Sequence, residues 1–207
     1  MPRNVTAFEI NSTSLSISWL TPGDPNGIIL RYNVSLYRQE STQRVLIETI
    51  SVDAIPGQDS YSIVFDNLIA FTLYSVQVSA ATSVGEGISS APMFVTTDPD
   101  RPSRPSFVLA EVLNSTAVRL SWGYPDTPRG NITGYIIRHN TTNNEFTEFN
   151  LTTNNDMQNQ TFLFTGLLPF TYYEFLVSAF TVAEEITHFG LPEEDIIQTD
   201  EDRKYNT

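Results

Sequence analysis

The amino-acid sequence predicts an all-β protein made of two tandem seven-stranded antiparallel β-sandwiches. Three observations support this fold: apolar and polar residues alternate over most of the chain, no segment has a sustained helical period, and the chain contains an internal repeat. The stretch 11–19, which ends at Trp19, recurs as the stretch 114–122, which ends at Trp122. A repeat of roughly 100 residues is longer than a solenoid unit of about 20–50 residues and has the size of one autonomous domain.

Both copies contain short segments in which every second residue is apolar. In the first of them, Leu15, Ile17 and Trp19 alternate with serines. This pattern is typical of antiparallel strands that bury one face and expose the other, and Gly/Pro-rich turns separate the segments. The clearest expected strands cover residues 15–19, 30–36, 61–65 and 74–80 in the first copy, and 118–122, 135–137, 162–164 and 173–179 in the second.

The boundary between the copies is expected near residue 98. One domain would cover residues 1–98 and the second residues 99–207, with a proline-rich linker at about 98–105. Three prolines occupy every third position of this linker, beginning at Pro99. Such spacing favours polyproline II, an extended conformation of about 3.1 Å per residue. We therefore expect a short, semi-rigid joint.

Two longer runs carry a resemblance to a known family. The run Leu68-Ile-Ala-Phe-Thr-Leu-Tyr74-Ser-Val-Gln-Val-Ser-Ala80 has a counterpart in Leu167-Leu-Pro-Phe-Thr-Tyr-Tyr173-Glu-Phe-Leu-Val-Ser-Ala179. Both are similar to the Leu-x-Pro-x-Thr-x-Tyr-x-x-x-Val-x-Ala pattern of fibronectin type III domains, which are immunoglobulin-like sandwiches. With the repeated Trp and Tyr of the preceding strands, the resemblance covers nearly the whole chain.

The resemblance implies a buried structural core in each copy. The implied core residues are Trp19, Tyr32, Leu68, Tyr74, Trp122, Tyr135, Leu167 and Tyr173. It also implies that Tyr74 and Tyr173 are tyrosine-corner residues, whose hydroxyl bonds back to the backbone of the preceding crossover. Ala70 departs from the family pattern where Pro169 conforms. We expect this difference to loosen the first turn without changing the fold.

Composition excludes several classes of protein. The chain has no cysteine, so it can form neither disulfide bonds nor thiolate zinc sites, and it lacks the cysteines typical of immunoglobulin domains and cytokine receptors. Its net charge of −13 would repel nucleic acid. No apolar run approaches the roughly 20 residues of a membrane span, and nothing at Met1 resembles a signal peptide. We interpret the chain as a segment of a longer protein.

Glycosylation motifs indicate the compartment. Eight of the 15 asparagines begin an Asn-x-Ser/Thr motif without proline, whereas the 43 Ser and Thr among 207 residues predict about 3 by chance. The predicted sites are Asn4, Asn11, Asn33, Asn114, Asn131, Asn140, Asn150 and Asn159. The alternative explanation is that Asn, Ser and Thr are common in β-turns. Because the motifs are so dense, we predict extracellular exposure.

Residues suited to catalysis or metal binding are few. His139 and His188 are expected in solvent at a strand end and in the last hairpin loop, without partners at catalytic spacing. We therefore predict no catalytic, cofactor-binding or metal-ligating residue and no cofactor. The tripeptide 129–131 is similar to the integrin-binding Arg-Gly-Asp sequence, but the acid is missing. The acidic stretch 184–202 suggests either a weak patch for a divalent cation or a basic partner or, as we expect, a solvated face.

The resemblance implies a structural role. We expect a non-catalytic extracellular spacer of a large glycosylated receptor, anchored by a single membrane span, with neighbouring repeats of the same type as partners. The stretch 19–32 resembles repeats of receptor-type tyrosine phosphatases, in which the phosphatase domain would lie outside this chain. Two alternatives stay open: a ligand-binding or homophilic adhesion module, and an accessory module of a secreted enzyme. Any extracellular protein ligand stays unidentified.

Overall fold

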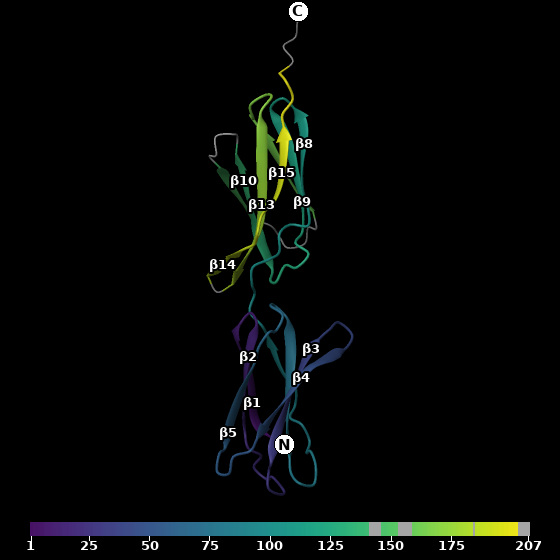
Figure 1. Cartoon of the computed structure of the whole chain (residues 1–207), viewed down its shortest axis with the longest axis vertical. Coiled ribbons are helices and arrows are strands. Elements are labelled where there is room, and N and C mark those ends of the chain that lie inside the picture. The colour runs from purple at the N-terminus through teal and green to yellow at the C-terminus, as the bar shows by residue number, and fades with distance from the viewer. Residues whose placement is uncertain (141–145, 153–158, 184, 203–207) are drawn as a thin grey trace, which may run out of the picture. The chain divides into compact units, whose positions relative to one another are not determined.

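The computed structural model describes residues 1–140, 146–152, 159–183 and 185–202 (Figure 1). Every helix or strand assigned in these ranges is a β-strand, and every pair of strands is antiparallel. The contacts divide the chain into two compact units, Met1–Asp98 (unit 1) and Pro99–Thr207 (unit 2). The described part of the chain has no helix with the length and apolar character needed to span a bilayer.

Unit 1 is built from two antiparallel sheets. Its strands are β1 (Arg3–Asn11), β2 (Ser14–Leu20), β3 (Arg31–Gln39), β4 (Arg44–Asp53), β5 (Ser60–Phe65), β6 (Leu73–Ala81) and β7 (Met93–Thr96). One sheet has the order β1-β2-β5 and the other the order β4-β3-β6-β7. The buried faces of both sheets contribute to a single hydrophobic cluster, so unit 1 is a β-sandwich.

Unit 2 repeats this arrangement with one addition. Its strands are β8 (Val108–Asn114), β9 (Ala117–Gly123), β10 (Ile132–Asn140), β11 (Thr147–Thr152), β12 (Asn159–Thr165), β13 (Tyr172–Ala183), β14 (Ile186–Phe189) and β15 (Glu193–Gln198). One sheet has the order β12-β9-β8; in the other, β11, β10 and β13 are neighbours, and both β14 and β15 pair with β13.

The expectation of seven strands is therefore wrong for unit 2, where the described residues form eight. The cause is the length of β13, which is 12 residues against 9 for the equivalent β6. The end of β13 pairs with β14: Phe180 is opposite Phe189, and Ala183 is opposite Ile186. The rings of Phe180 and Phe189 lie 6.0 Å apart. An edge extension of this kind leaves the sandwich unchanged.

The period-two pattern places the core. Along β2, Leu15, Ile17 and Trp19 are buried while the serines between them are half-buried. All eight residues that the resemblance implied as core are buried, with relative exposures between 1% and 8%. They fall into two clusters that share no residue, one in each unit. Because full burial of a large apolar side chain contributes about 1.5–3 kcal/mol, each unit has its own source of stability.

The length difference between the copies lies in one hairpin. Tyr32 on β3 pairs with Val52 on β4, whereas the equivalent Tyr135 on β10 pairs with Leu151 on β11. The β3–β4 hairpin is thus four residues longer than the β10–β11 hairpin. Both hairpins keep the same inward-facing positions, since the insertion is an even number of residues.

Most of the expected linker packs on unit 2. Pro102 and Pro105 are buried, and Pro105 forms an isolated bridge with Pro125. The backbone N–H of Asp100 donates to the carbonyl of Arg129 at 2.8 Å. Residues 99–105 are therefore part of the second unit's surface layer.

Candidate functional site

Each unit contains a tyrosine corner. The Tyr74 hydroxyl accepts a hydrogen bond from the backbone N–H of Ile69 at 3.0 Å, and the Tyr173 hydroxyl accepts one from Leu168 at 2.8 Å. Both tyrosines are nearly fully buried. The hydroxyl is thus the partner of a backbone group that would otherwise lie unsatisfied where the chain crosses between the sheets.

A buried threonine completes each corner. In unit 1, the Thr97 hydroxyl donates to the Ile69 carbonyl at 2.7 Å and accepts the Thr72 N–H at 3.0 Å. In unit 2, Thr199 makes the same two bonds with Leu168 and Thr171, at 2.7 and 3.0 Å. The corner hydrogen bonds are therefore the same whether the turn contains alanine or proline.

The crossover before each corner tyrosine contains a residue in a left-handed conformation. These residues are Phe71, with φ of 49°, and Phe170, with φ of 48°. A positive φ is unfavourable at a phenylalanine, and a backbone hydrogen bond compensates for it here. The N–H of Phe71 donates to the Asp98 carbonyl, and the N–H of Phe170 donates to the Asp200 carbonyl, both at 3.0 Å. This geometry holds the last strand of each unit against the crossover.

A tryptophan and a tyrosine anchor each core. The rings of Trp19 and Tyr32 lie 5.6 Å apart in an edge-to-face arrangement, and those of Trp122 and Tyr135 lie 5.5 Å apart in the same arrangement. Burial raises the pKa of Tyr135 to about 12, so its hydroxyl is neutral under all physiological conditions. These side chains stabilise the fold and offer no reactive group.

The predicted glycosylation sites differ in exposure. Six of the eight asparagines are exposed: Asn4, Asn11, Asn114, Asn131, Asn150 and Asn159. Asn33 is half-buried, and the Ser51 hydroxyl donates to its Oδ1 at 2.7 Å. Asn140 is buried, with 7% relative exposure. In this conformation Asn140 lacks the room that a glycan needs.

Two of these sites share one turn geometry. Asn11 accepts the N–H of Thr13 at 2.8 Å, and Asn114 accepts the N–H of Thr116 at 2.9 Å, both through the side-chain Oδ1. These are Asx turns, which explains why asparagine occupies the same place in both copies. Both bonds use Oδ1, so Nδ2, the atom that carries an N-linked glycan, takes no part in them. Turn chemistry and glycosylation are therefore compatible here.

The expectation of solvent-facing loop histidines is wrong. His139 lies on β10, and its ring stacks on Phe149 at 5.8 Å and meets Phe164 edge-to-face at 5.1 Å. Within the described residues its Nδ1 is buried without a hydrogen-bond partner, and burial lowers the pKa of His139. The alternation through Ile137 carried the signal that this histidine faces inward. His188 lies on β14, half-buried.

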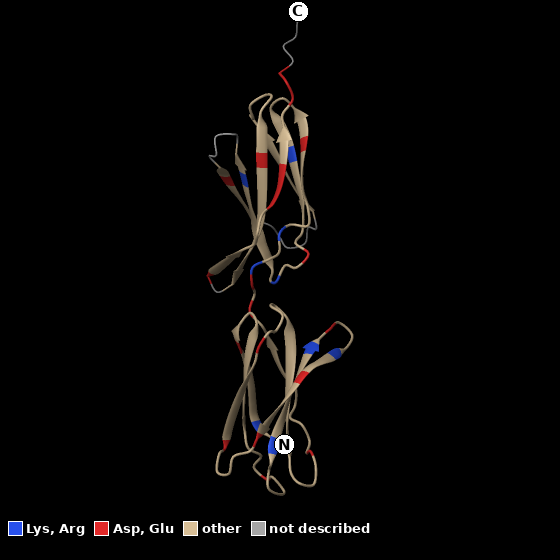
Figure 2. Ribbon diagram, in the orientation of Figure 1, with Lys and Arg blue, Asp and Glu red and all other residues tan. Residues whose placement is uncertain are grey.

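The acidic stretch 184–202 is spread along a strand. Figure 2 shows acidic residues along β15. The Glu193 carboxylate lies 3.1 Å from an Arg104 nitrogen, and Asp195 accepts the backbone N–H of Ala110 at 2.8 Å. In the part of the chain that the structure describes, no three His, Cys, Asp or Glu side chains are grouped so that they could hold a metal ion. Residue 184 lies outside the described residues. The arrangement corresponds to a solvated face.

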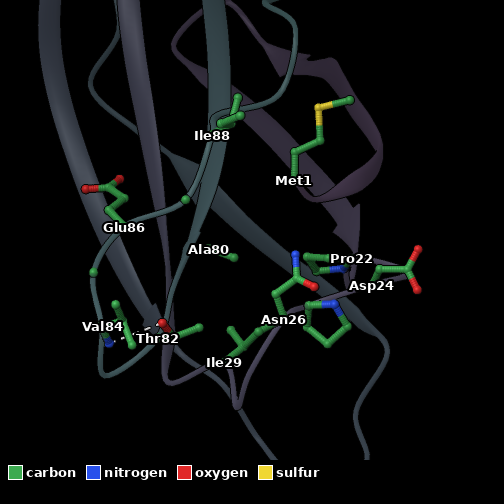
Figure 3. Close-up of a pocket in the computed structure, with 13 residues that line it drawn as sticks. Met1, Pro22, Asp24, Asn26, Ile29, Ala80, Thr82, Val84, Glu86 and Ile88 are labelled. Atoms are coloured by element: carbon green, nitrogen blue, oxygen red, sulfur yellow. Dashed lines mark hydrogen bonds between the residues drawn. The ribbon is translucent and has the colours of Figure 1, made fainter.

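Unit 1 has a groove at one end that no sequence pattern indicated (Figure 3). It has a volume of about 480 Å³ and lies between the loop that follows β2 and the loop that follows β6. Pro22, Asp24 and Asn26 line it from the first loop, and Thr82 and Glu86 from the second. A pocket of this kind depends on two loops far apart in sequence, so no local pattern could have revealed it.

Comparison with protein families now decides the identity of the fold. The family model described as "Fibronectin type III domain" matches residues 1–96 and 103–190. The chain belongs to the fibronectin type III family. Its two units are therefore tandem fibronectin type III domains, and their sandwiches and tyrosine corners are those of the family.

Relatives of these fibronectin type III domains occur in large receptors. The chain is 36% identical over 137 residues to the phosphatidylinositol phosphatase PTPRQ of Rattus norvegicus, covering 66% of this chain and 6% of the relative. It is 36% identical over 199 residues to the tyrosine-protein phosphatase Lar of Drosophila melanogaster, covering 87% and 9%. It is also 36% identical over 182 residues to the human netrin receptor DCC, covering 86% and 12%. The chain thus spans a small part of each relative's length.

Proposed function

We propose that the chain is a non-catalytic spacer module in the extracellular part of a single-pass cell-surface receptor of the receptor-type tyrosine phosphatase kind. Each fibronectin type III domain serves as a compact strut, and neighbouring repeats in the same polypeptide are its partners. The phosphatase chemistry named for PTPRQ and Lar would reside outside this chain.

The observation that carries the proposal is the distribution of polar and reactive groups. The two cores are filled by aromatic and aliphatic side chains. Among the described residues, the one side chain packed against them that changes charge near neutral pH is His139, which contacts aromatic rings. Six predicted glycosylation sites are exposed around these cores. A rigid interior with a glycan-bearing exterior suits a structural element of a cell-surface protein.

Glycan mapping after secretion from mammalian cells tests the extracellular location. The full chain is fused to a secretion signal, and the occupancy of each site is measured by peptide mass spectrometry before and after enzymatic deglycosylation. We expect glycans at exposed sites such as Asn11 and Asn114. The buried Asn140 is the internal control and should remain unmodified.

Substitution identifies the origin of the glycan mass. The changes Thr13→Ala and Thr116→Ala should each remove one glycan without loss of secretion, because they destroy the Asn-x-Thr motif and keep the asparagine Oδ1 that accepts the turn N–H. A folded, secreted chain without any glycan at the exposed sites would contradict the proposal.

Sedimentation velocity separates the strut from an adhesion module. We expect a spacer to stay monomeric at high micromolar concentration, because its proposed partners are neighbouring repeats of the same polypeptide. A dimer that forms with rising concentration would favour homophilic adhesion instead. The glycosylated protein is used for this measurement, since glycans shield part of the surface.

A further inference from the structure

The groove of unit 1 is apolar at its rim and open. Val84 and Ile88, which line it, have relative exposures of 97% and 82%. Figure 3 shows the residues from the first loop and those from the second on opposite sides of the space. Large aliphatic side chains that are this exposed are unfavourable in water, which suggests that another group covers them.

Two landmarks show that unit 2 has the same groove. Gly27 faces Thr82 in unit 1, and Gly130 faces Thr181 in unit 2: a Cβ on either glycine would lie 3.6 or 3.1 Å from the threonine Cγ2. Both glycines have φ between +140° and +160°. The strand registers support this match. Tyr32 pairs with Ala80, two residues before Thr82, and the equivalent Tyr135 pairs with Ala179, two residues before Thr181.

A third landmark is a glycine in the loop that follows the long strand. The N–H of Gly87 donates to the Ala80 carbonyl at 2.8 Å, and the N–H of Gly190 donates to the Ala179 carbonyl at 2.9 Å. A Cβ on either glycine would lie 3.2 Å from that same carbonyl oxygen. The backbones of the two grooves therefore correspond at each of these points.

In unit 2, the chain itself fills the groove. A Cβ on Gly130 would lie 3.0 Å from the Cβ of Pro99, and a Cβ on Gly190 would lie 2.7 Å from the carbonyl oxygen of Pro102. The N–H of Asp100 donates to the Arg129 carbonyl at 2.8 Å, and the N–H of Ser103 donates to the Thr127 carbonyl at 2.9 Å. Segment 99–104, which runs directly into the buried Pro105, is thus held by backbone hydrogen bonds and by two prolines.

In unit 1, the same places are open. Among the described residues, a Cβ on Gly27 would meet only Thr82, and a Cβ on Gly87 only the Ala80 carbonyl oxygen. Pro2, like the equivalent Pro105, is buried, and Met1 lies at the groove. The path that segment 99–104 follows in unit 2 therefore leads, in unit 1, through the groove to residue 1.

Unit 1 also offers the matching hydrogen-bond acceptors. The Arg129 carbonyl corresponds to that of Asn26, and the two residues share a left-handed conformation, with φ of 47° and 50°. By the same match, the Thr127 carbonyl corresponds to that of Asp24. The carbonyls of Asn26 and Asp24 accept no backbone hydrogen bond among the described residues of the chain. They are placed to receive the N–H groups of an extended segment.

Charge favours a basic occupant. Asp24 and Glu86 are the charged side chains among the residues that line the groove, and both are acidic. The Ser79 hydroxyl donates to the Glu86 carboxylate, which lowers the pKa of Glu86 and keeps it ionised. The segment 99–104 carries Arg101 and Arg104, so a segment of this composition would place positive charge near a negative surface.

We propose that the unit 1 groove is a docking site for an extended, proline-bearing, basic peptide segment that is covalently continuous with residue 1. The segment has the chemistry of residues 99–104, with prolines three positions apart, and it adds backbone hydrogen bonds to the carbonyls of Asp24 and Asn26. This inference rests on the comparison of the two units and does not depend on the proposed function.

The test extends the full chain at its N-terminus. A start methionine and the sequence Pro-Asp-Arg-Pro-Ser-Arg, copied from residues 99–104, are placed before Pro2, in place of Met1. Amide hydrogen exchange, followed by NMR, reports on the Asp and Ser amides of the extension. We expect protection of at least about tenfold over the unstructured rate, as well as shifted resonances of Thr82 and Gly87. Exchange at the unstructured rate would overturn the proposal.

A matched pair of glycine substitutions supplies the control. Gly87→Ala should abolish the protection of the extension, because a Cβ at the equivalent Gly190 would lie 2.7 Å from a segment carbonyl oxygen. Gly190→Ala should likewise release the amides of Asp100 and Ser103 in unit 2. An extension with glycine at both proline positions should show weaker protection. If Gly87→Ala leaves the protection intact, the extension does not occupy the groove.

Discussion

The two units share a frame but place their aromatic side chains differently. In unit 1, Tyr61 stacks on Trp19 at 5.8 Å and lies 4.7 Å from Tyr32. Its hydroxyl accepts the N–H of Ile55 at 2.9 Å. In unit 2, the position of Tyr61 is occupied by Gln160, as the strand registers show. The aromatic trio of unit 1 is thus reduced to a pair.

Unit 2 compensates at another place in its core. The equivalent sets are Leu36, Ile50, Ile63 and Val76 in unit 1, and His139, Phe149, Phe162 and Phe175 in unit 2. The ring centroids of the second set lie 4.7 to 5.8 Å from one another or from that of Phe164. The comparison shows that the alternating pattern and the corner fix the sandwich, while the large side chains can be redistributed.

Truncation of the anchoring tryptophans is expected to have the largest effect. Trp19→Ala should lower the free energy of unfolding of unit 1 by about 3–5 kcal/mol, and Trp122→Ala should do the same to unit 2. Each change should leave the other unit at its original stability, because the two cores share no residue. Denaturation is followed by circular dichroism and by the fluorescence of the remaining tryptophan, which then reports on the other unit alone.

The same experiment tests whether the two units unfold independently. If Trp19→Ala shifts the unfolding transition that Trp122 reports, the units are energetically coupled and cannot be treated as independent copies. Trp19→Phe is the conservative control, since it retains an aromatic ring and should cost less than the alanine variant.

Loss of the corner hydroxyl is expected to have the next largest effect. Tyr74→Phe and Tyr173→Phe each leave one backbone N–H without its partner, which should cost about 1–3 kcal/mol. The two costs should be alike because the two bonds have similar lengths, 3.0 and 2.8 Å. Urea denaturation of the two variants measures them. A difference between the two costs larger than 1–2 kcal/mol would show that the corners are not equivalent.

Most of the fold could be predicted from the sequence, because the patterns that indicate the strands and the corners are local. Alternation through Trp19 and Trp122 placed the inward positions of the strands, and the runs that end at Ala80 and Ala179 placed the corners. The extra strand β14 was not predicted because the expected strand ended at residue 179 and His188 was expected in the last hairpin loop, whereas β13 continues to Ala183 and pairs there with β14. Local patterns describe single strands well and strand edges poorly.

The groove and the histidine were missed for different reasons. The groove depends on how two loops and segment 99–104 meet, which is a tertiary property. We expected His139 in solvent because histidine is a polar residue, although it follows Tyr135 and Ile137 at every second position of the same strand. Tertiary packing decided both cases, and in the second the sequence pattern agreed with the packing.

The pH dependence of stability should distinguish the units. Burial lowers the pKa of His139 in the folded state, so the unfolded state binds more protons below its own pKa of about 6.5. The free energy of unfolding of unit 2 should therefore fall as the pH is lowered through about 6.5, and level off below the folded-state pKa. Unit 1, with Leu36 at this position, should show no such fall.

Denaturation at about pH 7.5 and about pH 5.5 measures this effect, since carboxylates remain ionised in that range. Trp122 fluorescence in a Trp19→Phe background reports on unit 2. The matched variant His139→Leu copies unit 1 and should remove the fall. We expect the effect to be smaller than that of the corner variants because His139 is only half-buried. Unchanged pH dependence in His139→Leu would assign the titration to another group.

The smallest expected effect concerns the turn before the corner. Ala70→Pro should stabilise unit 1 by about 0.4–1 kcal/mol, because proline restricts the unfolded chain and the equivalent Pro169 already fits the same hydrogen bonds. Pro169→Ala should destabilise unit 2 by a similar amount. Measured together by urea denaturation, the two changes should have opposite signs and comparable sizes. If Ala70→Pro destabilises unit 1, the turns differ in backbone conformation, although Thr72 and Thr171 bond to them in the same way.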